Sequence, residues 1–250
     1  MIASLPMYWR AETADAWQAL WTRASAERAG WPQKLLPPEA LGDLAGHWTS
    51  PDLLVSQTCG LPFRSALRGR VRYVATPDFA LPGSPPGYYR SVAVMRRGDR
   101  RGWDELRLAY NGGDSQSGWA AAVEAFAARN LPLPRSRLHS GAHAASARAV
   151  AENRADLAFI DAVTWRLIER FDSVAARLEV VHETAPTPGL PLITGQPGQA
   201  PALREALGDA IRSLPDASRA ALGGLSGLCV LPEARYLEMP LPPPVTAETA

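Results

Sequence analysis

The sequence predicts an α/β fold with mainly parallel sheets flanked by helices, divided into two lobes. Segments with the pattern of strands alternate with segments with the pattern of helices along most of the chain, which is typical of parallel βα units. Joints rich in proline and glycine, near residues 82–89 and 183–191, interrupt this alternation. They suggest a first lobe of residues 1–89 plus 186–250 and a second lobe of residues 90–185, joined by two crossings with a ligand cleft between them.

The first block begins with a short buried strand and a helix over residues 13–29. One face of this helix is apolar at positions i, i+3, i+4 and i+7, and Gly30 supplies a stop signal at its end. The apolar residues of that face are Trp17, Leu20, Trp21 and Ala24. The strands predicted for this block are residues 2–5, 52–55 and 70–76.

The second block restarts the pattern after residue 90, and residues 156–160 form its continuous apolar strand. The strands predicted for it are residues 91–95, 107–110, a short piece near 138, 156–160 and 178–181. The helices predicted for it are residues 118–129, 142–153 and 162–170. Two further helices, at residues 202–214 and 217–222, precede a proline-rich segment, 241–245, which we expect to be frayed.

The composition is that of an ordinary globular protein, with 46% apolar and 20% charged residues. A formal net charge of +1 gives no reason to expect nucleic acid or an anionic membrane as a partner. The chain has no run of about 18 apolar residues, so no transmembrane helix is expected. The first residues lack the basic and apolar regions of an export signal, and the chain as written predicts a cytoplasmic location. For Cys59 and Cys229, two reduced thiols are a simpler interpretation than one long-range disulfide.

The polar turn at residues 111–118, between a strand and a helix, is the most informative stretch. The first N–H groups of a helix have no internal partner, and the helix dipole adds positive charge there, so such a turn can hold an anion. Ser115 and Ser117 add hydroxyl donors, and Gly118 allows close approach to the backbone. The alternative interpretation is a serine cap after a glycine-rich turn.

A second turn of this kind, at residues 139–143, precedes the next predicted helix and ends in His143. This histidine is either a ligand contact or a capping or core residue, and Gly141 argues against a zinc site shared with His139. Asp161 ends the apolar strand, where a carboxylate caps the next helix or accepts a hydrogen bond from a ligand. Three further candidates stand at strand ends or at a lobe crossing: Tyr8, Thr58 and Tyr89.

Six stretches of the sequence, in this order, carry a resemblance to a known family. They are residues 52–60 (DLLVSQTCG), 89–91 (YRS), 114–118 (DSQSG), 141–146 (GAHAAS), 156–164 (DLAFIDAVT) and 184–192 (TAPTPGLPL). Over residues 2–194 the chain resembles the phosphate- and phosphonate-binding components of ABC importers, which are type II periplasmic binding proteins. The resemblance implies a two-lobed protein that captures phosphate, phosphite or a phosphonate between its lobes and closes by hinge bending.

The S-x-S-G turn is the most specific element of the resemblance. It implies that Ser115, Ser117 and Gly118, with Gln116 in the same turn, contact the oxyanion. By the same resemblance the remaining ligand candidates are Tyr8, Thr58, Tyr89, His143 and Asp161. The resemblance also implies an ABC permease as partner and a periplasmic location. We expect a monomer without cofactor or metal.

Two other functions remain open from the sequence. A hydrolase or transferase would use Ser115 or Ser117 with His143 and Asp161 as nucleophile, base and orienting group. The G-x-S-x-G pattern is absent, however, because a serine stands where the second glycine belongs. A cytosolic sensor domain with the same fold is the third interpretation, since fold alone does not determine function.

Overall fold

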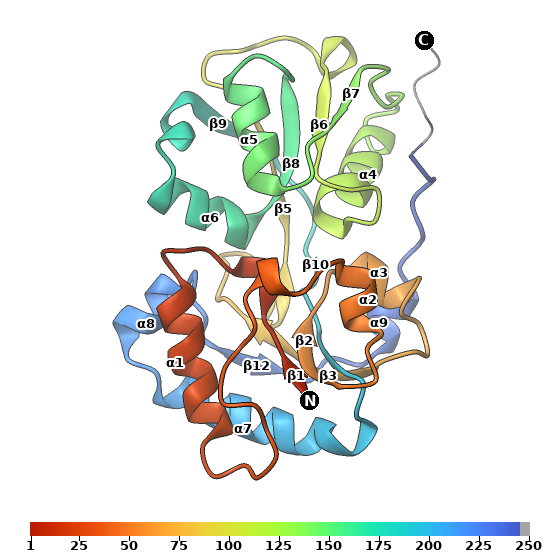
Figure 1. Cartoon of the computed structure of the whole chain (residues 1–250). Coiled ribbons are helices and arrows are strands. Elements are labelled where there is room, and N and C mark those ends of the chain that lie inside the picture. Colours follow the sequence, from red (N-terminus) through yellow and green to blue (C-terminus); the bar gives the residue numbers. More distant parts are fainter. Residues whose placement is uncertain (246–250) are drawn as a thin grey trace. The chain divides into compact units, whose positions relative to one another are not determined.

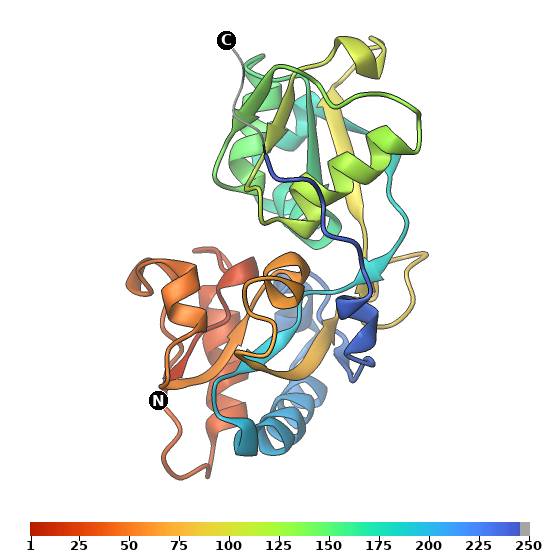
Figure 2. The same ribbon diagram turned by 90° about the vertical axis from the view of Figure 1, so that its right-hand side faces the viewer.

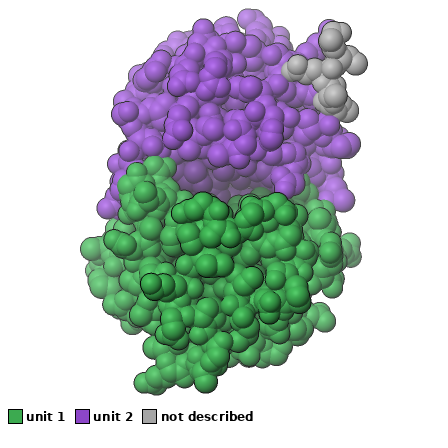
Figure 3. Space-filling model, in the orientation of Figure 1, with its two compact units in different colours: residues 1–88, 188–239 green, residues 89–187, 240–250 purple. Residues whose placement is uncertain are grey.

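The computed structural model describes residues 1–245, which form two compact units (Figures 1 and 3). Among the described residues, unit 1 comprises Met1–Tyr88 and Pro188–Met239, and unit 2 comprises Tyr89–Thr187 and residues 240–245. The chain therefore passes between the units three times, whereas the sequence suggested two crossings and grouped the whole tail with the first lobe. At the first two crossings, β4 (Tyr88–Tyr89) and β10 (Thr187–Pro188) pair as a two-stranded sheet.

Unit 1 is built on a five-stranded sheet with the strand order β1-β2-β11-β3-β12. Its strands are β1 (Ile2–Ala3), β2 (Leu53–Gln57), β3 (Arg72–Asp78), β11 (Leu192–Thr194) and β12 (Gly227–Cys229). Its helices are α1 (Ala14–Ser25), α2 (Leu44–Trp48), α3 (Gly60–Arg64), α7 (Ala200–Ser213), α8 (Asp216–Ala221) and α9 (Ala234–Leu237). Helix α1 buries the apolar face that its sequence predicts and contacts α7. It ends four residues early because Ala26 is extended and Glu27 has a positive φ of 58°.

Unit 2 is built on a second five-stranded sheet with the order β7-β6-β8-β5-β9. Its strands are β5 (Ser91–Arg96), β6 (Leu108–Tyr110), β7 (Arg137–His139), β8 (Leu157–Asp161) and β9 (Leu178–Glu183). Its helices are α4 (Ala121–Ala127), α5 (His143–Ala151) and α6 (Ala162–Phe171). The proline-rich segment expected to be frayed instead belongs to this unit, where Val245 packs against its apolar core.

Alternating side chains of β5 and β8 fill two separate cores on opposite faces of the unit 2 sheet. Residues of α5 and α6 contribute to one core, and residues of α4 contribute to the other. Successive strand residues point to opposite faces, so a strand covered on both sides is apolar at every position. This explains the continuous apolar run of β8, in which each residue from Leu157 to Ile160 is fully buried.

The α/β class with helices flanking the sheets is confirmed, but the sheets are mixed rather than mainly parallel. In unit 2, β6 pairs in parallel with β7 and β8, whereas β5 lies antiparallel between β8 and β9. In unit 1, β11 is likewise antiparallel to β2 and β3. Strands joined by helical connections do share one direction, as the alternation predicts. In each sheet one strand of opposite direction, β5 in unit 2 and β11 in unit 1, lies between two of these strands and is antiparallel to both.

Candidate functional site

The polar turn after β6 leads into a helix that starts with a π-helical turn, Gln116–Ala120, and continues as α4. Ser115 caps this helix, since its Oγ accepts a hydrogen bond from the Gly118 N–H at 2.9 Å. The Ala120 N–H donates to the Ser115 carbonyl at 3.0 Å, which is the wider spacing of a π turn. Such turns occur often at functional sites. Ser115 therefore has the capping role that the sequence left open.

Gly118 is required by packing within the turn itself. A Cβ at this position would lie 1.8 Å from Asn111 Oδ1 and 3.1 Å from Ser115 Oγ. The space expected for a ligand next to this glycine is thus occupied by Asn111. Asn111 was not among the predicted ligand residues and was included only as the first residue of the polar turn at 111–118. Its Oδ1 is buried and has no hydrogen-bond partner among residues 1–245.

Ser117 and His143 form the central contact of the site. Ser117 Oγ and His143 Nε2 lie 2.8 Å apart, and Ser117 is only 3% exposed. Burial lowers the pKa of His143 to about 4, although the Phe159 backbone opposes this shift. The ring is therefore neutral near pH 7. These two candidates, 26 positions apart in the sequence, are brought together by adjacent strand-end turns.

The second turn, between β7 and α5, is held by its own serines. Ser140 Oγ donates to the Tyr110 carbonyl at 3.1 Å and shares a hydrogen bond of 2.7 Å with Ser146 Oγ. These bonds attach the start of α5 to the end of β6, so they fix the position from which His143 reaches Ser117.

Asp161, at the end of β8, is the N-cap of α6. Its Oδ1 accepts hydrogen bonds from the N–H groups of Val163 at 2.7 Å and Thr164 at 3.0 Å. The carboxylate is 2% exposed. Because β6, β7 and β8 run in parallel, their carboxyl ends share one edge of the unit 2 sheet. The turn at Ser115–Gly118, His143 and Asp161 all follow that edge.

Two other candidates belong to unit 1 and follow its parallel strands β1 and β2. Tyr8 is 4% exposed and packs edge-on against Phe79, with ring centroids 5.0 Å apart. Thr58 is fully buried, and its N–H donates to the Pro191 carbonyl at 3.1 Å. Gln57, beside it, has a buried Oε1 without a hydrogen-bond partner among the described residues, and no pattern in the sequence distinguishes it from its neighbours. Tyr89 lies in β4 at the crossing and is 2% exposed.

The family model for the periplasmic substrate-binding protein of phosphonate ABC transporters matches residues 2–228. The chain belongs to this family of phosphonate-binding proteins. The family is thus one of periplasmic solute-binding proteins, as the resemblance implied. No curated protein sequence matches the chain.

Solved structures with low sequence identity to this chain share its fold. A binding-protein component of an ABC phosphonate transporter from Pseudomonas aeruginosa is 16% identical with a TM-score of 0.73, over 95% of this chain and 83% of that chain. PhnD1 from Prochlorococcus marinus, solved with methylphosphonate, is 13% identical with a TM-score of 0.71, over 95% and 94% of the two chains. A Xanthomonas citri protein bound to ATP is 15% identical with a TM-score of 0.66, over 95% and 93%. The predicted type II periplasmic-binding-protein fold is confirmed.

Two further properties of residues 1–245 bear on function. None of the helices there has the length and apolar character needed to cross a bilayer. No group of three or more histidine, cysteine or acidic side chains in that part of the chain is placed to hold a metal ion.

Proposed function

We propose that this phosphonate-binding protein captures a small phosphonate or phosphate anion through the Ser115–Gly118 turn and His143, for uptake by an ABC permease. The observation that carries the proposal is the hydrogen bond between Ser117 and His143 at the start of a helix. The first N–H groups of a helix have no partners within it, and those other than the Gly118 N–H, which Ser115 caps, favour a negative ligand. A tetrahedral anion needs several converging donors, and this edge of unit 2 supplies backbone N–H groups and the Ser117 hydroxyl, which His143 orients.

The tautomer of His143 decides whether Ser117 can donate to the ligand. A neutral imidazole carries one proton, and a hydroxyl has one proton to give. If His143 Nε2 carries the proton and donates it to Ser117 Oγ, the serine proton is available to the anion. His143 then orients Ser117, and an anion bound nearby would raise the pKa of the imidazole.

The other candidates remain predictions as ligand residues. Ser115 shapes the turn through its bond to Gly118, and Asp161 supports the same sheet edge as the cap of α6. Gln116 belongs to the π-helical turn next to Ser117. Tyr8, Thr58 and Tyr89 stay in the proposed ligand set on the resemblance and on their strand-end or crossing positions. The permease partner, the monomeric state and the periplasmic location of this chain are likewise proposals.

The Ser117–His143 pair also has the geometry of a nucleophile and a base, so turnover must be considered. An activated serine needs a third group that orients the base. Among residues 1–245 no carboxylate hydrogen-bonds to the His143 ring, and Asp161 Oδ1 is used to cap α6. Because the chain belongs to a family of solute-binding proteins, we propose capture without hydrolysis.

Calorimetry and thermal unfolding with methylphosphonate, phosphate and sulfate test the proposal. A ligand that binds only the folded chain stabilises it by about 2.7 kcal/mol at 100 times its Kd. Ser117→Ala should weaken binding about tenfold or more, since a hydrogen bond to a charged group contributes about 1.5–3 kcal/mol. Ser136→Ala, at an exposed serine of unit 2, is the matched control and should bind like the wild type. If neither methylphosphonate nor phosphate binds at millimolar concentration, the proposed ligand class is wrong.

A further inference from the structure

The C-terminal segment 240–245 lies beyond the part of the chain that the family model matches, and it belongs to unit 2. It follows α9, which is anchored in unit 1 by the fully buried Tyr236. The Tyr236 hydroxyl donates to the Gly189 carbonyl at 2.7 Å and lies 2.5 Å from Thr76 Oγ1. The chain then continues to unit 2 as the blue segment of Figures 1 and 2.

Contacts made by Pro243 and Val245 attach this segment to unit 2. The Pro243 carbonyl accepts a hydrogen bond from Trp119 Nε1 at 2.8 Å. Val245 packs against the core that contains Trp119 and Phe126. Val245 also approaches the backbone of Gly113 so closely that a Cβ there would lie 2.9 Å from its Cγ2.

These contacts fall on both sides of the proposed anion-binding turn. Gly113 precedes Ser115 by two residues, and Trp119 follows Ser117 by two residues within the π-helical turn. The Trp119 side chain is 1% exposed and also packs against Tyr110 at the end of β6. The segment thus contacts the turn before its first serine and after its second.

We propose that residues 240–245 act as a C-terminal strap that positions the Ser115–Gly118 turn for anion binding. The inference rests on the proposed function of that turn. The strap does not itself contact the anion; it fixes the indole of Trp119 and the backbone at Gly113, and through them the direction of Ser117.

The composition of the strap suits this role. Four of its six residues are prolines, which favour an extended conformation and lose little conformational entropy when they dock. Proline offers a carbonyl acceptor but no N–H donor, and the indole N–H is a donor only. Without Pro243, the nearly buried Trp119 would lose its acceptor, and the indole would have to move towards water, taking the π-helical turn with it.

A truncation series tests the strap, with methylphosphonate as the probe. A chain ending at Met239 lacks the strap, and a chain ending at Val245 retains it and serves as the control. We expect the first to bind methylphosphonate about tenfold more weakly in calorimetry and the second to bind like the full chain. Trp119→Phe keeps an aromatic ring but removes the donor, so it provides a second test if the truncated chain does not fold. It should weaken binding about threefold to tenfold.

Two further readouts separate positioning from general destabilisation. Amide hydrogen exchange of residues 112–120 without ligand should be faster in the chain ending at Met239 than in the chain ending at Val245. The indole N–H resonance of Trp119, identified with Trp119→Phe, should shift on ligand addition in the full chain. Ile168→Val, in the core on the opposite face of the sheet, lowers stability without touching the strap and should leave the Kd unchanged.

The outcomes distinguish this inference from the proposed function. If the full chain binds no methylphosphonate or phosphate but truncation still speeds exchange at 112–120, the proposed ligand is wrong and the strap still positions the turn. If truncation leaves both the Kd and the exchange unchanged, the inference that the strap positions the turn is overturned. The inference is also overturned if Ile168→Val weakens binding as much as truncation does.

Discussion

At the scale of single residues, the burial of His143 ties folding to pH. The pKa of its imidazole is about 4 in the folded chain, below the ordinary value of 6.5, because burial disfavours the charged ring. The unfolded chain therefore binds a proton more readily between these values. Above pH 6.5 the ring is neutral in both states and costs the fold nothing. As the pH falls from 6.5 towards 4, the unfolded chain takes up a proton that the folded chain does not, so the free energy of unfolding decreases.

This contribution can be isolated by comparing the wild type with His143→Asn in urea unfolding between pH 7.5 and 4. The difference in unfolding free energy between the two should shrink on acidification, by up to about 3 kcal/mol, since one pKa unit corresponds to about 1.4 kcal/mol. Burial also lowers the pKa of His47 and His182. Because the wild type and His143→Asn both contain these two histidines, their contributions cancel when the unfolding free energies are subtracted. Parallel curves for the two chains would mean that His143 is hydrated in solution.

The residues of the candidate site also show how far side-chain chemistry can be predicted from sequence. The serines and His143 were identified because a polar turn before a helix has a recognisable composition. The sequence left a cap and a ligand contact open for Ser115, which caps the helix through the Gly118 N–H. The role of Gly118 could not be assigned, because it depends on where Asn111 lies after the backbone folds. Asn111 gave no signal of its own, since an asparagine after a strand is common in turns.

At the scale of secondary structure, long periodic elements were predictable, whereas several of the short ones were not. Helix α1 and strand β8 carry their pattern in their own residues, an apolar stripe in one and a continuous apolar run in the other. The elements α2, α3, β11, β12 and α9 have three to five residues each, too few to show a period. Their conformation depends on contacts with segments that are distant in the sequence. Strand β11, for example, is held by pairing with β2 and β3 on its two sides.

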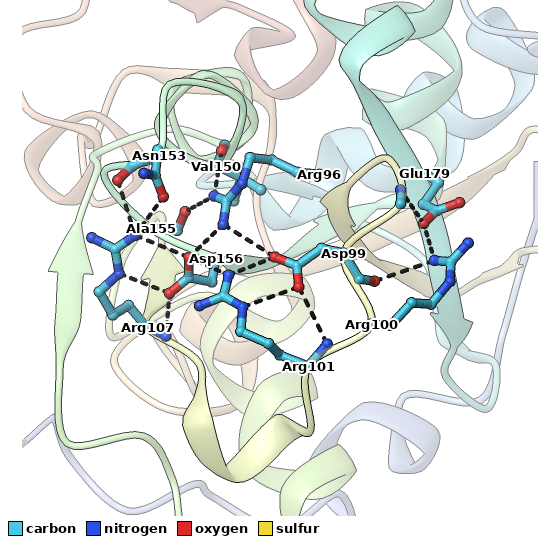
Figure 4. Close-up of polar contacts among 11 residues, drawn as sticks. Arg96, Asp99, Arg100, Arg101, Arg107, Val150, Asn153, Ala155, Asp156 and Glu179 are labelled. Carbon is cyan, nitrogen blue, oxygen red and sulfur yellow. Dashed lines mark hydrogen bonds and ion pairs between the residues drawn. The ribbon is translucent and has the colours of Figure 1, made fainter.

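A network of arginines around Asp156 fixes the loop between β5 and β6 to the start of β8 (Figure 4). The Asp156 carboxylate is 1% exposed and accepts hydrogen bonds from Arg96, Arg101 and Arg107 at 2.7–2.9 Å. Burial raises its pKa, but these three arginines outweigh burial and hold the pKa well below its usual range. Hydrogen bonds and charge from Arg101 similarly lower the pKa of Asp99 to about 2. Both groups stabilise the fold above pH 4–5, and this stability is lost as the pH falls through their folded-state pKa values.

Asp156→Asn should therefore destabilise the chain at pH 7 and weaken its response to acid. The neutral amide leaves three guanidinium groups close together, and because two of them are more than a third exposed we expect a loss of about 1–3 kcal/mol. Urea unfolding at pH 7 and pH 3 measures both effects. Asp209→Asn, which removes an exposed pair with Arg212, is the control and should change stability by less than about 0.5 kcal/mol. Equal losses in the two variants would contradict the network's role.

At the scale of the whole molecule, the division into two units with several chain crossings predicts a change of shape on ligand binding. The sequence indicated the first two crossings through their proline and glycine, but it could not indicate the third. The tail is also proline-rich, yet its attachment depends on an indole more than 100 residues earlier in the chain. Two units joined by short segments close on a ligand by hinge bending, with the backbone change absorbed at a few residues near the crossings. We predict these residues near Tyr89 and Glu183.

Small-angle scattering should then give a smaller radius of gyration with saturating methylphosphonate than without it. A ligand can shift such an equilibrium only by its differential affinity for the two states, so the decrease should follow the calorimetric binding curve. Ser117→Ala, measured at the wild-type ligand concentration, should show a smaller decrease that recovers when more ligand is added. Sulfate at the same ionic strength controls for screening by salt. If calorimetry shows full occupancy while the radius of gyration stays constant, this chain binds its anion without hinge closure.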